Sequence, residues 1–181
     1  MTLDTVELVN SQIANDLDGA FPDLVRDMQH GIYSGVRRMV PSSADAEDIT
    51  QETFIRAYRA LGGYSSDRIR ELNLPGWLWT IALNLCRNAA RTRSRRPRTV
   101  ELDRDAFFTG RGPEAEVVEA DENRRWSELL EGLPSAQRTA VVLRHVVGLT
   151  YREISVATGR PQGTVKADVH RGITKLQEVL S

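Results

Sequence analysis

Cysteine is almost absent from this sequence of 181 residues, and the single one, Cys86, excludes an internal disulfide. The 3 histidines lie far from it along the chain without zinc-binding spacing, so we expect neither a metal nor a cofactor. Long apolar runs are missing too, since no stretch approaches the roughly 18 uncharged apolar residues of a membrane span. The acidic first part of the chain lacks the basic start of a secretion signal. We therefore expect a cytoplasmic protein without membrane insertion.

The alternating pattern of a β-strand is also missing. Apolar residues instead recur at helical spacing along most of the chain, which predicts an all-α protein. The periodicity fails after residue 95, in a stretch with several prolines and glycines. We therefore predict two small helical domains, residues 1–96 and 122–181, joined by a flexible linker at 97–121. The expected helices span residues 4–16, 20–40, 44–61, 76–95, 122–131, 135–147, 151–158 and 162–179.

Charge is strongly segregated along the chain, although the net charge is only -1. Residues 1–67 carry 11 acidic and 5 basic residues, whereas residues 68–98 carry 1 acidic and 8 basic ones. The pattern then repeats, with 10 acidic and 4 basic residues in 99–135, and 3 acidic and 7 basic ones in 136–181. Two basic blocks of this kind favour contact with a polyanion at two places, and solvated surface charge is the alternative.

The stretch GLTYREISVATGRPQGTVKADVHRGITKL has the pattern of a helix-turn-helix. Thr150 and Glu153 have capping-box spacing, so a helix should begin at Tyr151. Gly159 is placed to end that helix, and Pro161 suits the first turn of the next one. Two short helices joined around a glycine form a DNA-reading motif, and a plain helical hairpin is the alternative.

The second helix of this pair has two distinct faces. One is an apolar stripe that should pack on Ile154 and on residues 141–143, and it consists of Val165, Val169, Ile173 and Leu176. The other face consists of Gly163, Ala167, His170, Arg171 and Thr174, with Lys166 beside it. Small residues beside cations let a helix enter the major groove, so Lys166 and Arg171 are candidates for base contacts. Thr164 fits a phosphate contact or a cap equally well.

The stretch PGWLWTIALNLCRNAARTRSRR places aromatic, amide and guanidinium groups on one helix face. The face consists of Trp77, Thr80, Asn84, Arg87, Asn88 and Arg91, and more arginines follow. Tryptophan offers a stacking surface, asparagine bonds base edges and arginine holds phosphate, which suits unstacked DNA. The opposite stripe should be core, and so should at least one of Trp77 and Trp79. A basic arm is the alternative for the arginine run.

The stretch DAEDITQETFIRAYRAL forms an acidic helix near the start of the chain. Its inward arc consists of Ala46, Ile49, Thr50, Thr53, Phe54, Ala57 and Leu61. Its outward face consists of Asp48, Gln51, Glu52, Ile55 and Arg59, with Asp45 at the edge. An exposed isoleucine among carboxylates is typical of a protein-binding patch for a basic partner, and a solvated face is the alternative.

These three stretches together resemble bacterial sigma factors. The acidic helix resembles the region that binds core RNA polymerase, and GWLWTIALNLCRNAARTRSRR resembles the helix that melts and reads the minus-ten promoter element. The stretch LPSAQRTAVVLRHVVGLTYREISVATGRPQGTVKADVHRG resembles the domain that reads the minus-thirty-five element. The likeness covers about residues 20–96 and 122–181, and the two-domain size resembles the extracytoplasmic-function (ECF) class.

The resemblance implies a polymerase subunit that directs promoter recognition, melting and initiation and is not an enzyme. Its implied partners are core RNA polymerase, at the β′ clamp helices and the β flap, promoter DNA and an anti-sigma factor. The implied polymerase contacts are Asp45, Asp48, Gln51, Glu52, Ile55 and Arg59. The implied minus-ten contacts are Trp77, Asn84, Arg87, Asn88 and Arg91. The implied minus-thirty-five contacts are Arg160, Gln162, Thr164, Lys166, Ala167, His170 and Arg171.

Two further roles follow from the resemblance. Residues 64–74 would form the loop that captures an extruded minus-ten base, because base flipping requires a pocket outside the duplex. Three of the linker's carboxylates would lie in the path of RNA through the polymerase; they are Glu101, Asp103 and Asp105.

Two places depart from the family pattern. Ala167 and Asp168 stand where relatives commonly have Ser-Arg, which removes a phosphate contact and adds repulsion. We therefore expect weak or unusual recognition of the upstream element. The loop RIRELNLPG also differs from the usual short junction, so the family does not imply its base preference.

Two other classes have similar C-terminal patterns. A two-component or quorum-type regulator would need a signal-receiving or ligand-binding domain in front, but this N-terminal half lacks strand signals. A serine recombinase would need a strand-borne nucleophilic serine with clustered arginines, but Ser11 lies in an acidic, helical stretch. Dependence on added polymerase would separate both classes from a sigma factor.

Overall fold

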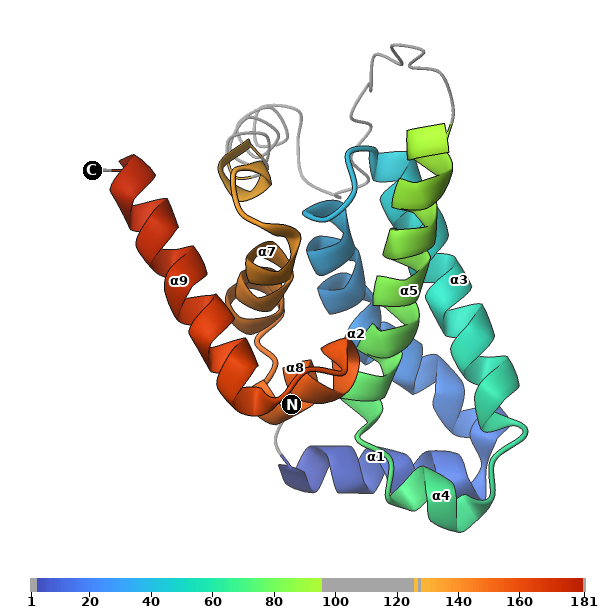
Figure 1. The fold of residues 1–181 in the computed structure, drawn as a ribbon. Coiled ribbons are helices and arrows are strands. Elements are labelled where there is room, and N and C mark those ends of the chain that lie inside the picture. The colour runs from blue at the N-terminus through green and yellow to red at the C-terminus, as the bar shows by residue number, and fades with distance from the viewer. Residues whose placement is uncertain (1–2, 96–125, 127, 181) are drawn as a thin grey trace, which may run out of the picture.

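Helices make up the fold, and no strand occurs in the residues that the computed structural model describes, namely 3–95, 126 and 128–180 (Figure 1). In chain order the elements are α1 (Leu3–Asn15), α2 (Leu17–Arg37), α3 (Ser43–Leu61), α4 (Ser66–Arg70), α5 (Leu74–Arg95), α7 (Ser135–Val141), the π-helical turn η1 (Val142–Val146), α8 (Tyr151–Thr158) and α9 (Gln162–Leu180). Residues 128–131 are helical as well. The predicted all-α class is confirmed.

Side-chain caps encoded in the sequence start several of these helices. Asp16 caps α2, Ser42 caps α3 and Ser65 caps α4, each accepting a hydrogen bond from a backbone N–H in the first turn. At α8 the predicted capping box is present: the Thr150 N–H donates to Glu153 Oε2 over 2.6 Å, and the Glu153 N–H donates to Thr150 Oγ1 over 3.2 Å. Each cap of this kind stabilises a helix by about 1 kcal/mol.

The predicted helix bounds agree with the structure to within about three residues at most ends. The segment 64–74 was predicted as a loop, but it contains α4, because Ser65 caps a helical turn that buries Ile69 in the core. The helix predicted at 135–147 changes into the π-helical turn after Val141. The predicted linker at 97–121, with Glu101, Asp103 and Asp105, lies outside the described residues.

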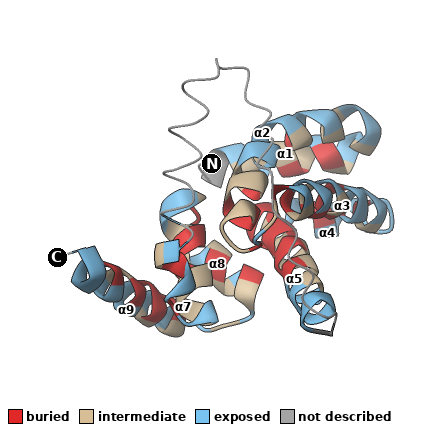
Figure 2. Cartoon of the chain, turned by 90° about the horizontal axis from the view of Figure 1, so that it is seen from above, coloured by how far each residue is buried: buried red, intermediate tan, exposed pale blue. Residues whose placement is uncertain are grey.

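Helices α2, α3 and α5 run beside one another, and α1 and α4 cross one end of them (Figure 1). Their buried stripes face inward, as the colouring by burial shows (Figure 2). Trp79 lies in this core and is 0% exposed, so the prediction that at least one of the two tryptophans of α5 is buried is confirmed. Burial of one large apolar side chain contributes about 1.5–3 kcal/mol, so these stripes account for much of the stability.

The C-terminal helices form the predicted helix-turn-helix. Gly159 ends α8 in the left-handed conformation with φ 69°, which glycine adopts without strain. The apolar stripe of α9 packs on α7 and α8, with Val165, Val169 and Leu176 buried. Ile154 and residues 141–143 are buried too, so the predicted packing of this stripe is confirmed.

The N-terminal and C-terminal helices are packed against each other. Helix α5 lies on α8, and α2 lies on η1. The core is continuous across this contact, since Leu78 and Trp79 belong to the same cluster of buried side chains as Ile154 and Ala157. The sequence left open whether the two predicted domains pack together, and in this structure they do.

The contact between the two parts requires glycine at two positions. A Cβ atom at Gly35 would lie 2.4 Å from Trp79 Cη2 and 2.8 Å from Val147 Cγ2. A Cβ atom at Gly76 would lie 2.7 Å from the Glu153 carbonyl oxygen and 2.9 Å from a Val156 carbon. Both sets of distances are far shorter than the usual contact of about 3.5–4.0 Å, so the helices approach closely because a side chain is missing.

Helix α1 holds the segment between α3 and α5 in place. Asn10 is 2% exposed, and its amide donates to the carbonyls of Arg70 over 3.2 Å and of Leu72 over 2.7 Å. The Ser66 hydroxyl donates to the Ala14 carbonyl over 3.0 Å. The backbone around α4 is therefore fixed by hydrogen bonds from a helix more than fifty residues away.

Replacing Asn10→Ala should lower the free energy of unfolding by about 1–3 kcal/mol, because two carbonyl groups lose their donor inside the protein. Urea denaturation followed by circular dichroism measures the change. The exposed neighbour Gln12→Ala is the matched control and should change the free energy by less than about 0.5 kcal/mol. Equal effects of the two substitutions would contradict a bracing role for Asn10.

Candidate protein-binding and nucleic-acid interfaces

The outer face of α3 mixes charge with apolar surface, as predicted. Its exposed side chains include Asp48, Gln51, Ile55 and Arg59. Glu52 is half-buried and accepts a hydrogen bond from Arg56 Nε over 2.6 Å, and Asp45 pairs with Arg93 of α5. Solvent-exposed ion pairs contribute about 0–1 kcal/mol, so both carboxylates are free to exchange these partners for others.

Tyr58 extends this face, and sequence reasoning missed it. The side chain is 40% exposed, close to the 44% of Ile55, which lies three residues earlier on the same helix. Its hydroxyl donates to Asp18 Oδ1 over 2.5 Å, and its ring packs edge-on against Phe21 at 5.1 Å between centroids. The hydrogen bond to Asp18 and the charge of that carboxylate raise the pKa of Tyr58. Ile55 and Tyr58 together form an apolar spot between charged groups.

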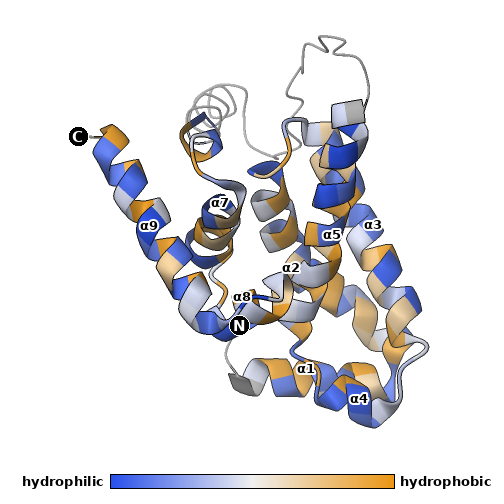
Figure 3. Ribbon diagram, viewed as in Figure 1, coloured by the Kyte–Doolittle hydropathy of each residue, from blue (hydrophilic) through white to orange (hydrophobic). Residues whose placement is uncertain are grey.

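The exposed face of α5 carries the predicted amide and guanidinium row. Its exposed members are Asn84, Arg87, Asn88 and Arg91. Arg87 Nη1 donates to Asn84 Oδ1 over 2.7 Å, so these two side chains are held as a pair. The hydrophilic bands on the C-terminal half of α5 mark this end of the helix (Figure 3). Free guanidinium donors in such a row are suited to phosphate contacts.

Trp77 differs from the rest of the predicted minus-ten row because it is half-buried. Its ring packs on Tyr64, with 5.9 Å between centroids. The Arg68 guanidinium lies 3.6 Å from the centre of the same tyrosine ring. Aromatic and cation–π contacts of this kind contribute about 0.5–1.5 kcal/mol each, and here they join the 64–74 segment to the start of α5.

The helix-turn-helix presents its predicted reading residues on one side of α9. Gln162, Lys166, His170 and Arg171 are exposed, whereas Arg160, Thr164 and Ala167 are half-buried. The Lys166 ammonium lies 5.5 Å from the Tyr151 ring centroid, and the Arg144 guanidinium lies 5.0 Å from it. One aromatic ring of α8 therefore orients two cations beside the predicted DNA face.

Asp168, which departs from the family pattern, lies inside this motif. Its side chain is 4% exposed and forms ion pairs with Arg160 and, at 2.8 Å, with Arg171. A free carboxylate would repel DNA phosphates, but this one is covered by two guanidinium groups. The trio keeps a net positive charge, so the carboxylate weakens its attraction to phosphate without reversing it.

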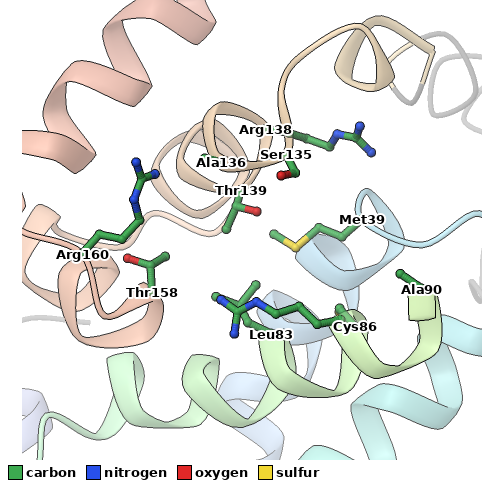
Figure 4. A pocket seen from close by; sticks show the side chains of 11 residues that line it. Met39, Leu83, Cys86, Ala90, Ser135, Ala136, Arg138, Thr139, Thr158 and Arg160 are labelled. Carbon is green, nitrogen blue, oxygen red and sulfur yellow. The ribbon is translucent and has the colours of Figure 1, made fainter. Parts of the chain in front are cut away.

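A pocket of about 360 Å³ lies between α5 and the C-terminal helices (Figure 4). Three arginines from different elements line it: Arg87 of α5, Arg138 of α7 and Arg160 of the turn before α9. Met39 and Cys86 belong to its apolar wall, and burial raises the pKa of the Cys86 thiol to about 12, so the thiol stays protonated. The structure thus brings a predicted minus-ten residue and a predicted minus-thirty-five residue to one pocket.

These surfaces are suited to binding macromolecules. Among the described residues, no three His, Cys, Asp or Glu side chains meet as a metal site. No helix in the described part of the chain is long and apolar enough to cross a membrane. The acidic and apolar face of α3 complements a basic protein surface, and the cationic faces of α5 and α9 complement nucleic acid.

Known families and proteins match this chain along most of its length. The family profile of Sigma-70 region 2 matches residues 24–96, and that of Sigma-70, region 4 matches residues 123–176. The RNA polymerase sigma-H factor of Pseudomonas aeruginosa is 32% identical over 170 residues, which cover 89% of this chain and 86% of the relative. The ECF RNA polymerase sigma-E factor of Escherichia coli is 36% identical over 161 residues, which cover 84% and 82%.

Solved structures with the same fold include CnrH in complex with the cytosolic domain of CnrY, with a TM-score of 0.73, 23% identity, and coverage of 97% of this chain and 96% of that one. The sigma factor RpoE in complex with the anti-sigma factor NepR from Bartonella quintana has a TM-score of 0.65, 22% identity, and coverage of 88% and 96%. The two family regions match in the expected order, and the curated relatives, which match along most of their length, are sigma factors. The chain belongs to the sigma-70 family, as an RNA polymerase sigma factor of the ECF class.

Proposed function

We propose that this sigma factor binds core RNA polymerase through the outer face of α3 and offers α5 and α9 to the two elements of a promoter. The observation that carries the proposal is the place of α5, which packs on α3 and also on α8. One helix thereby links the polymerase-binding face to both predicted DNA-binding faces. The polymerase supplies the chemistry, so the chain acts stoichiometrically, in the cytoplasm, and is not an enzyme.

The α3 face fits a basic protein surface such as the β′ clamp helices of the polymerase. Ile55 and Tyr58 supply apolar contact area at its centre, and Asp48 and Glu52 supply negative charge around it. Charge complementarity speeds association and fixes the register of two proteins, while buried apolar anchors supply much of the affinity. The inner face of α3 is buried against α2 and α5, so docking requires no rearrangement of the bundle.

Each DNA-binding face is small, so neither binds strongly alone. A face that neutralises a few phosphates gives weak, salt-sensitive binding, because affinity rises with the number of counterions released. Tethering of both faces on the polymerase raises their effective concentration at the promoter. DNA binding by this sigma factor therefore depends on the polymerase.

The predicted DNA faces lie too close together in this structure to engage a whole promoter. Arg87 and Arg160 line one pocket, and the Thr80 hydroxyl donates to the Val156 carbonyl over 3.3 Å. The two promoter elements lie about 25 base pairs apart, roughly 85 Å of duplex at 3.4 Å per base pair. The contact between α5 and α8 therefore opens before both elements are bound, and the structure corresponds to a closed state.

An anti-sigma partner would act on the equilibrium between the closed and the open state. A protein that binds the closed state more tightly than the open one shifts the population towards the closed state. RpoE was solved with the anti-sigma factor NepR, and CnrH with the cytosolic domain of CnrY, so proteins with this fold form complexes of the required kind. We assign this regulation to the present chain as part of the proposal.

Reversing one charge on the α3 face should weaken polymerase binding. Glu52→Arg places a cation where the partner surface is basic and leaves Arg56 beside a like charge, so initiation should fall at least tenfold, which corresponds to about 1.4 kcal/mol. Run-off transcription from a genomic promoter library with bacterial core polymerase measures it. Asp23→Arg on α2, whose side chain is 68% exposed, makes the same charge change elsewhere and should leave initiation unchanged. Full activity of Glu52→Arg would rule out this face.

Adding one methyl group at the contact between the two parts should open the closed state. Gly76→Ala places a Cβ atom 2.7 Å from the Glu153 carbonyl, so α8 must move away from α5. Cys86 then meets water, and its pKa falls from about 12 towards the ordinary value of about 8.5. The rate of thiol alkylation at pH 8 should rise at least tenfold, because more thiolate is present.

The control for this experiment is Gly63→Ala, where the new Cβ atom meets nothing closer than the Ala60 carbonyl at 3.6 Å. Its alkylation rate should match that of the unchanged protein. An unchanged rate in Gly76→Ala would show that the contact between α5 and α8 does not hold Cys86 from solvent.

A further inference from the structure

A buried carboxylate joins two of the arginines predicted to read the upstream element. Asp168 lies on the second turn of the recognition helix α9 and is 3% exposed. One of its oxygens accepts from Arg160, which stands in the turn before the helix. The other accepts from Arg171 Nη2 at 2.8 Å, three residues further along α9. Both carboxylate oxygens are thus used, each by a different guanidinium group.

The arrangement leaves both arginines able to bind DNA. Their side chains are 36% exposed for Arg160 and 58% exposed for Arg171, while that of Asp168 is 4% exposed. A guanidinium has five N–H donors, and the bond to Asp168 uses one donor of each group. The remaining donors are free for phosphate oxygens or for guanine O6 and N7. The carboxylate lies beneath the DNA-binding surface, and the cations lie on it.

The turn of the motif is fixed by the same group of contacts. Arg160 and Asp168 are eight residues apart, so their ion pair ties the turn to the body of α9. The Ser155 hydroxyl of α8 donates to the Arg160 carbonyl over 2.6 Å, which holds the backbone of that residue from the other side. Arginine side chains lose considerable rotamer freedom on binding, so a site that orders them beforehand reads its target more sharply.

We propose that Asp168 is a positioning residue for recognition of the upstream promoter element: it holds Arg160 and Arg171 in the geometry in which they read DNA. The inference rests on the proposed function of α9 and adds a specificity determinant to it. A carboxylate at this position weakens the net attraction to DNA, but it orders the Arg160 and Arg171 side chains. Its loss therefore changes which sequences are read more than how tightly DNA is held.

A purely electrostatic role for Asp168 gives the opposite expectation. Removing a negative charge near DNA would then strengthen binding to every sequence and leave the preferred sequence unchanged. A positioning role predicts weaker discrimination between sequences, with binding to unrelated DNA kept or raised. The two roles thus separate in sequence preference and cannot be confused with a general loss of folding.

The test is transcription by holoenzyme, made from the full chain and bacterial core polymerase, on a promoter library with a randomised upstream element. Sequencing of the transcribed templates gives the preferred element and the ratio of best to median sequence. Asp168→Asn should lower that ratio about tenfold, within the range expected for one lost bidentate base contact, while total initiation persists. A preference as sharp as that of the unchanged protein would overturn the proposal.

Two further variants make the result decisive. Glu178→Gln removes a charge from the same helix about 10 Å beyond Arg171 and should leave the preference unchanged. Asp168→Glu keeps the charge but lengthens the side chain, so it should also weaken the sequence preference, whereas a charge role predicts no change.

Thermal melting checks folding, and if Asp168→Asn melts below the assay temperature, Asp168→Glu alone decides. Absence of initiation with the unchanged protein would instead refute the proposed function itself.

Discussion

The arrangement of the helices is set by the packing of α5 on both of its sides. One side buries Leu78, Trp79 and Ala82 in the core, and the start of the same helix lies close to α8 at Gly76 and Thr80. Protein interiors are close-packed, so α8 cannot come nearer, and it cannot leave without exposing apolar surface. The α3 face can bind the polymerase whether or not α5 and α8 are in contact. The DNA faces of α5 and α9 can reach two separate promoter elements only when that contact is open.

Segregated charge serves two purposes in this chain. Acidic and basic surfaces face outward on α3, α5 and α9, where they match a basic protein or a polyanion. One carboxylate inside a basic region is structural: Asp168 joins Arg160 to Arg171 within the helix-turn-helix. A carboxylate in a basic region thus orders cations, and the count of charges along the chain does not reveal which carboxylates do so.

Local signals in the sequence were enough to predict the helices and the exposed faces. The capping box of Thr150 and Glu153 and the apolar periodicity of α9 depend on residues a few positions apart, so they are readable without a structure. The ion pairs of Asp168 join residues only eight and three positions away, but they depend on the conformation of the turn. The close approach at Gly76 and the packing of α4 on α1 depend on distant partners. Spacing along the chain carries no record of such partners, and this is why these features were missed.

We propose that the two predicted DNA faces lie together in the free protein and separate on a promoter. Single-molecule energy transfer between dyes at Thr92→Cys of α5 and Lys175→Cys of α9 measures it directly, since both positions are exposed and the buried Cys86 resists labelling. We expect high transfer in the free protein and almost none in the polymerase–promoter complex, where the two elements lie roughly 85 Å apart. Low transfer in the free protein, or equal transfer in both states, would contradict it.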